Sequence, residues 1–244
     1  LLLLHAEHAL EDTLQFLRYL PMAAGLGARI QLRVQPELHH LVAAMPALDA
    51  DPDIVLLGPD ASPAPCDLRC ALADLPAAFG TTLPTIPAVV PYLAPPPDLA
   101  APWQGAIPPG SPRIAICWAG AAGTLVPDAL AALLDGLTAA LPTARLHALG
   151  PDDPAATAVL DRFDTLLDLR PNTRHATHLA AALACMDLVL AVDGPVLHLA
   201  GALARPCFAL LAAAADWRWL IGRRDSPWYP TMRLFRQEAL NDWG

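Results

Sequence analysis

The fold of this chain is read most directly from one stretch, Leu188-Val189-Leu190-Ala191-Val192-Asp193-Gly194-Pro195-Val196-Leu197-His198. An apolar run ends at an acid and a Gly-Pro turn, and the residues after the turn predict a helix that begins near Pro195. A strand, a tight turn and a helix in this order are typical of an open α/β sheet. Such sheets bind ligands at the carboxyl ends of their strands, where the N–H groups of a helix start attract anions. We therefore expect a ligand site beside Asp193 and His198.

Outward from this stretch, apolar runs alternate with helical segments, which indicates an α/β fold with parallel sheets. In the first half we predict strands at 1–4, 29–34 and 54–57 and helices at 12–24 and 36–45, while 67–79 is ambiguous between strand and short helix. In the second half we predict strands at 114–118, 145–149, 166–169, 188–192 and 207–211, with helices at 127–141, 154–163, 176–186 and 195–203. The strands are nearly continuous apolar runs, as expected where helices cover both faces of a sheet.

A proline-rich segment separates the two halves. Residues 94–112 contain Pro-Pro-Pro-Asp and Pro-Pro-Gly-Ser-Pro, and proline at this density favours an extended, semi-rigid connection. We therefore predict two Rossmann-like domains, at 1–93 and 113–244, with the linker between them. Two such halves predict a cleft, which is where small-molecule sites usually form.

Composition excludes several classes of function. The 244 residues carry a net charge of −9 and no lysine, with all 15 positive charges supplied by arginine. This balance argues against nonspecific binding of nucleic acids or anionic membranes. Apolar runs are too short for a membrane span. No Walker loop, zinc spacing or Gly-x-Ser-x-Gly motif occurs.

The five cysteines are scattered and odd in number, which favours buried free thiols in a cytoplasmic protein. The chain starts at Leu1, inside a predicted strand, and ends equally abruptly at Gly244. We therefore expect a piece of a longer polypeptide.

Three blocks carry a resemblance to a known family: 5–16, which begins His-Ala-Glu-His-Ala-Leu-Glu-Asp-Thr; 78–93, with Ala-Phe-Gly-Thr-Thr-Leu and Pro-Tyr-Leu; and 193–230, with Asp-Trp-Arg-Trp and Asp-Ser-Pro-Trp-Tyr-Pro. The chain resembles glycosyltransferase family 9, the heptosyltransferases, and the related domain found behind tetratricopeptide repeats. The resemblance implies a GT-B arrangement of two Rossmann-like halves, and a metal-independent transfer of a sugar from a nucleotide-sugar donor to a hydroxyl acceptor, a saccharide or a protein. It also implies that tetratricopeptide repeats belong to the same longer chain.

On the acceptor side, the resemblance makes Asp12 the candidate catalytic base, and His5 and His8 flank the same loop. A structural alternative is open, because Asp is a favoured N-cap and Asp12 precedes a helical run. The family's glycines beside this acid are replaced by Ala9 and Glu11. Alanine costs space where glycine lets a ligand approach the backbone.

On the donor side, the resemblance points to the turn and helix start: Asp193, Gly194, Val196, Leu197 and His198. Thr124, Arg170, Arg174 and Arg218 are candidates to meet the diphosphate, since arginine grips phosphate bidentately. His198 has an alternative role, as a structural histidine that fastens strand to helix. The loop 119–124 lacks the family's basic residues, and 150–153 reads Gly-Pro-Asp-Asp where a lysine is common.

Two main functions follow from this pattern, and an interaction domain that works beside repeats is a third option. The first is a glycosyltransferase with Asp12 as base and the helix after Asp193 as donor site. The second is a catalytically inactive GT-B relative that binds a sugar, a nucleotide or a protein. The missing glycines and lysine favour the second, and the retained acids and tryptophan blocks favour the first.

Overall fold

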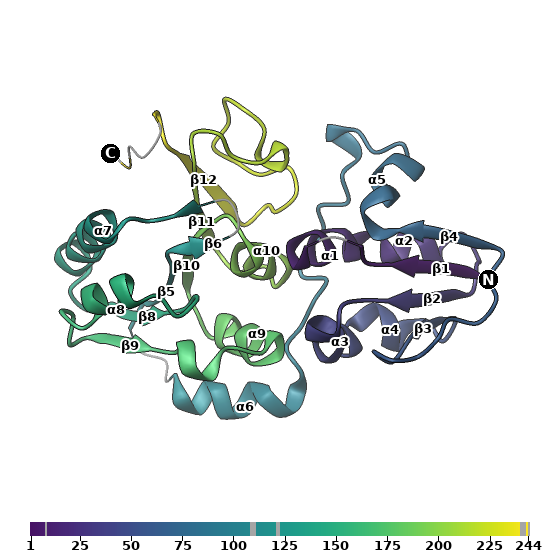
Figure 1. Ribbon diagram of the computed structural model, residues 1–244, viewed down its shortest axis with the longest axis horizontal. Coiled ribbons are helices and arrows are strands. Elements are labelled where there is room, and N and C mark those ends of the chain that lie inside the picture. Colours follow the sequence, from purple (N-terminus) through teal and green to yellow (C-terminus); the bar gives the residue numbers. More distant parts are fainter. Residues whose placement is uncertain (8, 108–110, 121–122, 240–242, 244) are drawn as a thin grey trace.

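The computed structural model describes residues 1–7, 9–107, 111–120, 123–239 and 243. Two α/β halves lie side by side, each built on a parallel sheet (Figure 1). One sheet takes its strands from residues 2–71 and the other from residues 113–236. The predicted fold class, α/β with two parallel sheets, is confirmed.

The first sheet has the order β3-β2-β1-β4, and all its pairs are parallel. Its strands are β1 (Leu2–His5), β2 (Ile30–Arg33), β3 (Ile54–Leu56) and β4 (Leu68–Ala71). Around them lie α1 (Leu10–Phe16), η1 (Leu17–Tyr19), α2 (Leu20–Ala24), α3 (Pro36–Ala43), α4 (Pro46–Ala50), η2 (Leu72–Asp74), α5 (Leu75–Ala78) and η3 (Leu83–Thr85). The single helix predicted at 12–24 is interrupted by η1, because Pro21 has no N–H to donate to the carbonyl one turn earlier.

The second sheet has the order β12-β11-β10-β5-β8-β9. Its strands are β5 (Arg113–Cys117), β8 (Arg145–Ala148), β9 (Leu166–Asp168), β10 (Leu188–Val192), β11 (Cys207–Leu211) and β12 (Met232–Arg236), which the sequence patterns missed. The helices are α7 (Pro127–Ala140), α8 (Pro154–Leu160), η4 (Arg170–Asn172), α9 (Ala176–Ala184), α10 (Pro195–Ala202) and η5 (Trp217–Trp219). Two short strands, β6 (Ala119–Gly120) and β7 (Gly123–Thr124), pair antiparallel with each other.

The proline-rich segment contains a helix, α6 (Pro97–Ala106), so the prediction of an extended connection is wrong for these residues. Proline at the first helical position costs no hydrogen bond, because its missing N–H would have no partner there. The buried Trp103 then holds the helix against α9, where its indole Nε1 donates to His178 Nδ1 at 3.2 Å. Packing of this aromatic side chain offsets the hydrogen bond that Pro102 removes inside the helix.

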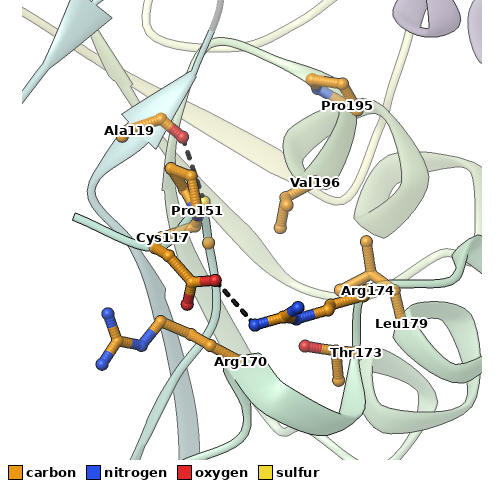
Figure 2. A pocket seen from close by; sticks show the side chains of 11 residues that line it. Cys117, Ala119, Pro151, Arg170, Thr173, Arg174, Leu179, Pro195 and Val196 are labelled. Atoms are coloured by element: carbon orange, nitrogen blue, oxygen red, sulfur yellow. Dashed lines mark hydrogen bonds and ion pairs between the residues drawn. The ribbon is translucent and has the colours of Figure 1, made fainter.

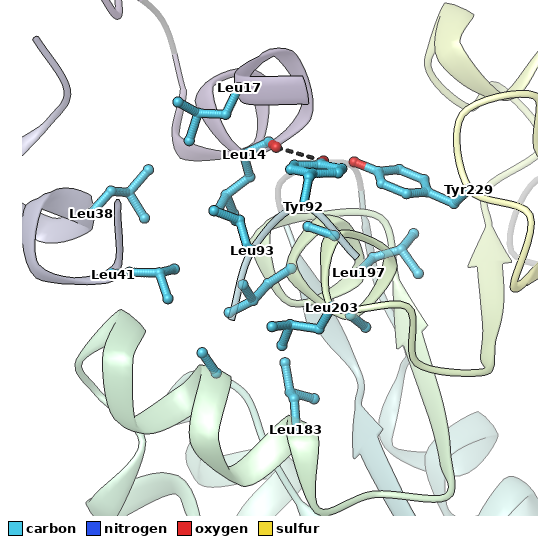
Figure 3. Close-up of a cluster of buried hydrophobic side chains, with 14 of the residues drawn as sticks. Leu14, Leu17, Leu38, Leu41, Tyr92, Leu93, Leu183, Leu197, Leu203 and Tyr229 are labelled. Carbon is cyan, nitrogen blue, oxygen red and sulfur yellow. Dashed lines mark hydrogen bonds between the residues drawn. The ribbon is translucent and has the colours of Figure 1, made fainter. Parts of the chain in front are cut away.

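A continuous apolar core joins the two halves (Figure 3). Helices α1 and α3 of the first half pack on α10 and α9 of the second. The buried leucines of this interface come from both sides: Leu14, Leu17, Leu38 and Leu41 from the first half, and Leu183, Leu197 and Leu203 from the second. Along this face, apolar side chains fill the space between the halves.

Candidate functional site

A pocket of about 480 Å³ lies at the carboxyl ends of strands in the second sheet. Residues after β5, β8 and β9 form its floor and walls, and the start of α10 closes one side (Figure 2). Its lining residues are Cys117, Ala119, Gly150, Pro151, Asp152, Arg170, Thr173, Arg174, Leu179, Pro195 and Val196. This is the edge at which open α/β sheets bind ligands. All of these residues belong to the second half, so the pocket does not span the two halves.

Arg170 lies in the pocket wall with its guanidinium already engaged. Its Nε and Nη2 donate to the two carboxylate oxygens of Asp168 at 2.9 and 2.8 Å, and Nη1 donates to Thr157 Oγ1 at 3.0 Å. The side chain is 7% exposed and lies over the Trp118 ring. Hydrogen bonding to Arg170 lowers the pKa of Asp168, so this pair stays charged. Arg170 therefore builds the wall and has few donors to offer a ligand.

Arg174 is the more accessible of the two cations. Its Nη2 donates to Asp152 Oδ2 at 2.8 Å, shown as the dashed line at Arg174 in Figure 2, and both side chains are 67% exposed. The pocket floor carries the Cys117 thiol, whose pKa burial raises to about 12, so it is uncharged. No local pattern pointed to Cys117 or Thr173 as pocket residues. Cys117 is the last residue of β5 and Thr173 follows β9, and the fold brings the ends of these two strands together.

Two of the predicted donor-site residues at the start of α10, Val196 and Leu197, lie in different surroundings. Val196 lines the pocket, next to Pro195. Leu197 is fully buried, and its side chain points into the core between the halves (Figure 3). Gly194 stands at the N-cap, and its carbonyl accepts from the His198 N–H at 3.2 Å.

Asp193 and His198 lie in a buried aromatic cluster behind the turn. Trp219 Nε1 donates to Asp193 Oδ2 at 2.7 Å, and His198 Nδ1 lies 2.8 Å from the Tyr229 hydroxyl. Burial raises the pKa of Tyr229 well above its ordinary value, so this hydroxyl keeps its proton. His198 is 0% exposed and does not line the pocket. The expectation that its imidazole meets the ligand is therefore corrected, and the structural alternative fits its position.

Asp12 and Arg218 meet at the junction of the halves, although they are 206 residues apart in the chain. Arg218 Nη2 pairs with Asp12 Oδ1, while Nη1 lies 3.0 Å from Asp216 Oδ1 and Nε donates to Gln15 Oε1 at 2.5 Å. Asp12 lies in the first turn of α1, whose N-cap is Ala9, so the N-cap alternative is wrong. Arg218 belongs to this junction and does not line the pocket that we expected it to serve.

Arg18 is a second link between the halves, and the sequence reasoning missed it. Its Nη1 donates to the Trp228 carbonyl at 2.5 Å, Nη2 donates to the Tyr92 hydroxyl at 3.1 Å, and Nε donates to the Gln15 carbonyl at 2.7 Å. The guanidinium also lies 4.5 Å from the centre of the Tyr229 ring. A charged residue in the middle of an apolar helix was the available signal, because such a residue needs buried partners.

The remaining expected site residues lie elsewhere. Thr124 is exposed on β7, opposite Ala119, and does not line the pocket. His5 ends β1, with its Nδ1 3.5 Å from Glu7 Oε1. His8 lies outside the described residues.

The described residues form neither a cluster of metal ligands nor a membrane-spanning helix. In that part of the chain, no group of three or more His, Cys, Asp or Glu side chains is arranged to hold a metal ion. No helix formed by these residues is both long and apolar enough to cross a membrane. Metal independence stays a prediction.

Comparison with solved structures identifies the architecture. A family 9 glycosyltransferase from Veillonella parvula superposes with a TM-score of 0.71 at 10% identity, over 97% of this chain and 85% of that chain. The chain has the GT-B-like fold of family 9 glycosyltransferases. The E. coli heptosyltransferase WaaC, solved with ADP, gives a TM-score of 0.65 at 12% identity, over 99% of this chain and 94% of that chain. The iron-containing dodecameric glycosyltransferase TibC of E. coli gives 0.62 at 14% identity, and the match covers 99% of this chain and 64% of TibC.

The match found by sequence comparison covers a smaller share of this GT-B-like chain than the structural matches do. Protein FlbA of Caulobacter vibrioides is 39% identical over 64 residues, which are 26% of this chain and 10% of FlbA. The matched part is thus about a tenth of the relative's length. No family model matches the chain.

Proposed function

We propose that this chain is a glycosyltransferase that binds the nucleotide part of a sugar donor in the second-half pocket. The observation that carries the proposal is the position of that pocket, at the carboxyl ends of β5, β8 and β9 and beside the start of α10. Doubly wound sheets bind nucleotides at this edge. WaaC, which shares the fold, was solved with ADP.

In the proposed reaction, Asp12 accepts the proton of an acceptor hydroxyl at the junction of the halves. The acceptor oxygen forms a bond to the anomeric carbon of the sugar. The bond from that carbon to the phosphate oxygen breaks, and its electron pair leaves with the nucleotide. Arg218 Nη2 pairs with Asp12 Oδ1 and so positions this carboxylate at the junction of the halves.

Binding is tested by calorimetric titration of the chain with uridine, cytidine, adenosine and guanosine mono- and diphosphates and their sugar conjugates. Val196→Phe places a ring in the pocket and should weaken nucleotide binding at least tenfold. Leu141→Phe, at the exposed end of α7, is the matched control and should bind as the wild type does. If no nucleotide binds the wild-type chain, the proposal fails.

Transfer is tested separately with a radiolabelled sugar nucleotide and an acceptor mixture. Asp12→Asn should lower transfer by about 10²-fold or more, since a positioned base supplies about 10²–10⁴-fold. Nucleotide affinity should stay unchanged, and full turnover by this variant would remove Asp12 from the role of base.

A second candidate function is a GT-B protein that binds its ligand without transferring a sugar. The ion pairs of Arg174 with Asp152 and of Asp12 with Arg218 favour it, because each engages a charged group that catalysis would use. Binding without transfer in the same experiments would support this candidate. Association with tetratricopeptide repeats in a longer chain remains part of the proposal for either function.

A further inference from the structure

We propose that Asp152 sets the charge of the ligand that the pocket accepts, so that a nucleotide with one phosphate binds at least as tightly as the matching diphosphate. This inference rests on the proposed function, because it concerns the same pocket. It adds a specificity-determining residue and a class of donor, a sugar linked to a nucleoside monophosphate.

The first step is the positive charge that the pocket can offer a phosphate. Arg170 and Arg174 are the arginines among its lining residues, and the chain contains no lysine. All three nitrogens of the Arg170 guanidinium already donate, to Asp168 and Thr157. Arg174 is therefore the cation in the lining that is free to turn toward a phosphate.

The second step is the negative charge beside that cation. Asp152, which also lines the pocket, pairs with Arg174 at 2.8 Å, so the charges of these two accessible lining residues offset each other. An exposed ion pair is weak, and a phosphate can displace the carboxylate from Arg174. Asp152 itself lines the pocket, so its carboxylate stays close to a bound phosphate and repels each further phosphate oxygen.

The third step is the start of α10, which offers a phosphate fewer backbone N–H donors than a helix start usually does. Backbone N–H groups at the first turn of a helix commonly bind a phosphate. The first position of α10 is Pro195, which has no N–H and lies in the pocket lining. The pocket therefore offers one accessible arginine and a helix start that lacks the N–H of its first residue. These groups suit one phosphate group better than two.

The experiment compares the dissociation constants of UMP with UDP, CMP with CDP, AMP with ADP and GMP with GDP by calorimetry. The wild-type chain should bind the monophosphate of the preferred base at least as tightly as its diphosphate. Asp152→Asn removes the carboxylate charge and should improve diphosphate affinity, relative to monophosphate affinity, by roughly fivefold, as expected for one interaction between exposed charges. Asp135→Asn, at an exposed position of α7, makes the same charge change elsewhere in the second half and should leave the ratio unchanged.

Three outcomes separate the two proposals. A shift of the affinity ratio in Asp152→Asn alone supports the role of Asp152. A wild-type chain that binds the diphosphate more tightly than the monophosphate, or an unchanged ratio in Asp152→Asn, overturns the inference and leaves the proposed function standing. An absence of binding by every nucleotide overturns both.

Discussion

At the scale of single residues, Gly201 shows how closely the helix after the Asp-Gly-Pro turn packs on its surroundings. A Cβ built on Gly201 would lie 2.4 Å from Cδ1 of Tyr229, the residue whose hydroxyl contacts His198. The space is filled by a ring that is itself completely buried. Glycine is therefore required here by the approach of an aromatic ring, which no local sequence pattern reveals.

Gly201→Ala should destabilise the chain by about 1–3 kcal/mol, because overpacking a buried site forces neighbouring side chains to shift. Urea unfolding followed by circular dichroism measures the change. Gly136→Ala is the matched control, since Gly136 is exposed inside α7 with no atom near the added methyl group. That substitution should stabilise the chain by about 0.5–1 kcal/mol. Equal effects of the two changes would contradict the packing that we describe.

At the scale of elements, an ion pair holds the start of β5 to the residue before β10. Arg113 Nε and backbone N both donate to Asp187 Oδ2 at 2.9 Å, and Nη2 donates to Oδ1 at 2.7 Å. Hydrogen bonding to Arg113 lowers the pKa of Asp187 below its ordinary value. This stabilisation is therefore present above the unfolded-state pKa of about 3.9 and is lost as the pH falls through the lower folded-state value.

Asp187→Asn should lower stability at pH 7 by about 0.5–1 kcal/mol, a small effect because the carboxylate is 46% exposed. The difference from the wild type should shrink below about pH 4, where the wild-type carboxylate begins to take up a proton. Urea unfolding at pH 7, 5 and 3.5 tests this, with Asp135→Asn as the control for loss of a surface charge. If the stability difference between Asp187→Asn and the wild type grew toward acid pH, the proposed contribution of the Asp187 carboxylate would be contradicted.

At the scale of the whole molecule, the apolar core and Arg18 join the two halves into one unit. The core is continuous from the first half to the second, and Arg18 donates to carbonyls or hydroxyls of Trp228 and Tyr92. If one half unfolded, the apolar interface of the other half would be exposed to water. Neither half should therefore unfold by itself. We therefore expect a single cooperative unfolding transition.

Scanning calorimetry should give equal calorimetric and van't Hoff enthalpies, which is the test of a two-state transition. Arg18→Met leaves buried acceptors without a donor and should cost about 2–3 kcal/mol while the transition stays single. Two separate transitions in the wild-type chain would show that the halves are independent.

The sequence predicted most of the strands, because each is an apolar run bounded by a turn or a proline. β12 was missed, since Met232–Arg236 alternates with two arginines and lies at the sheet edge. α6 was missed because local proline content predicts an extended chain, while the burial of Trp103 against α9 favours a helix. The boundaries at residues 93 and 113 stay a prediction.

For the candidate site, the sequence predicted the edge of the sheet and three residues that line the pocket, Arg170, Arg174 and Val196. Their partners followed from no pattern, because Asp152 and Arg174 come from different loops that only the parallel sheet brings together. The same holds for Asp12 and Arg218, which come from opposite halves.

The order of apolar runs and turns was therefore sufficient to specify a pair of parallel sheets and a ligand edge, because hydrophobic burial and turn geometry act locally along the chain. Folding determined which charges are free and which are paired, since an ion pair depends on distances between residues far apart in sequence. It also buried His198 and filled the space between the halves, because the shape of the apolar surfaces governs how two folded units pack.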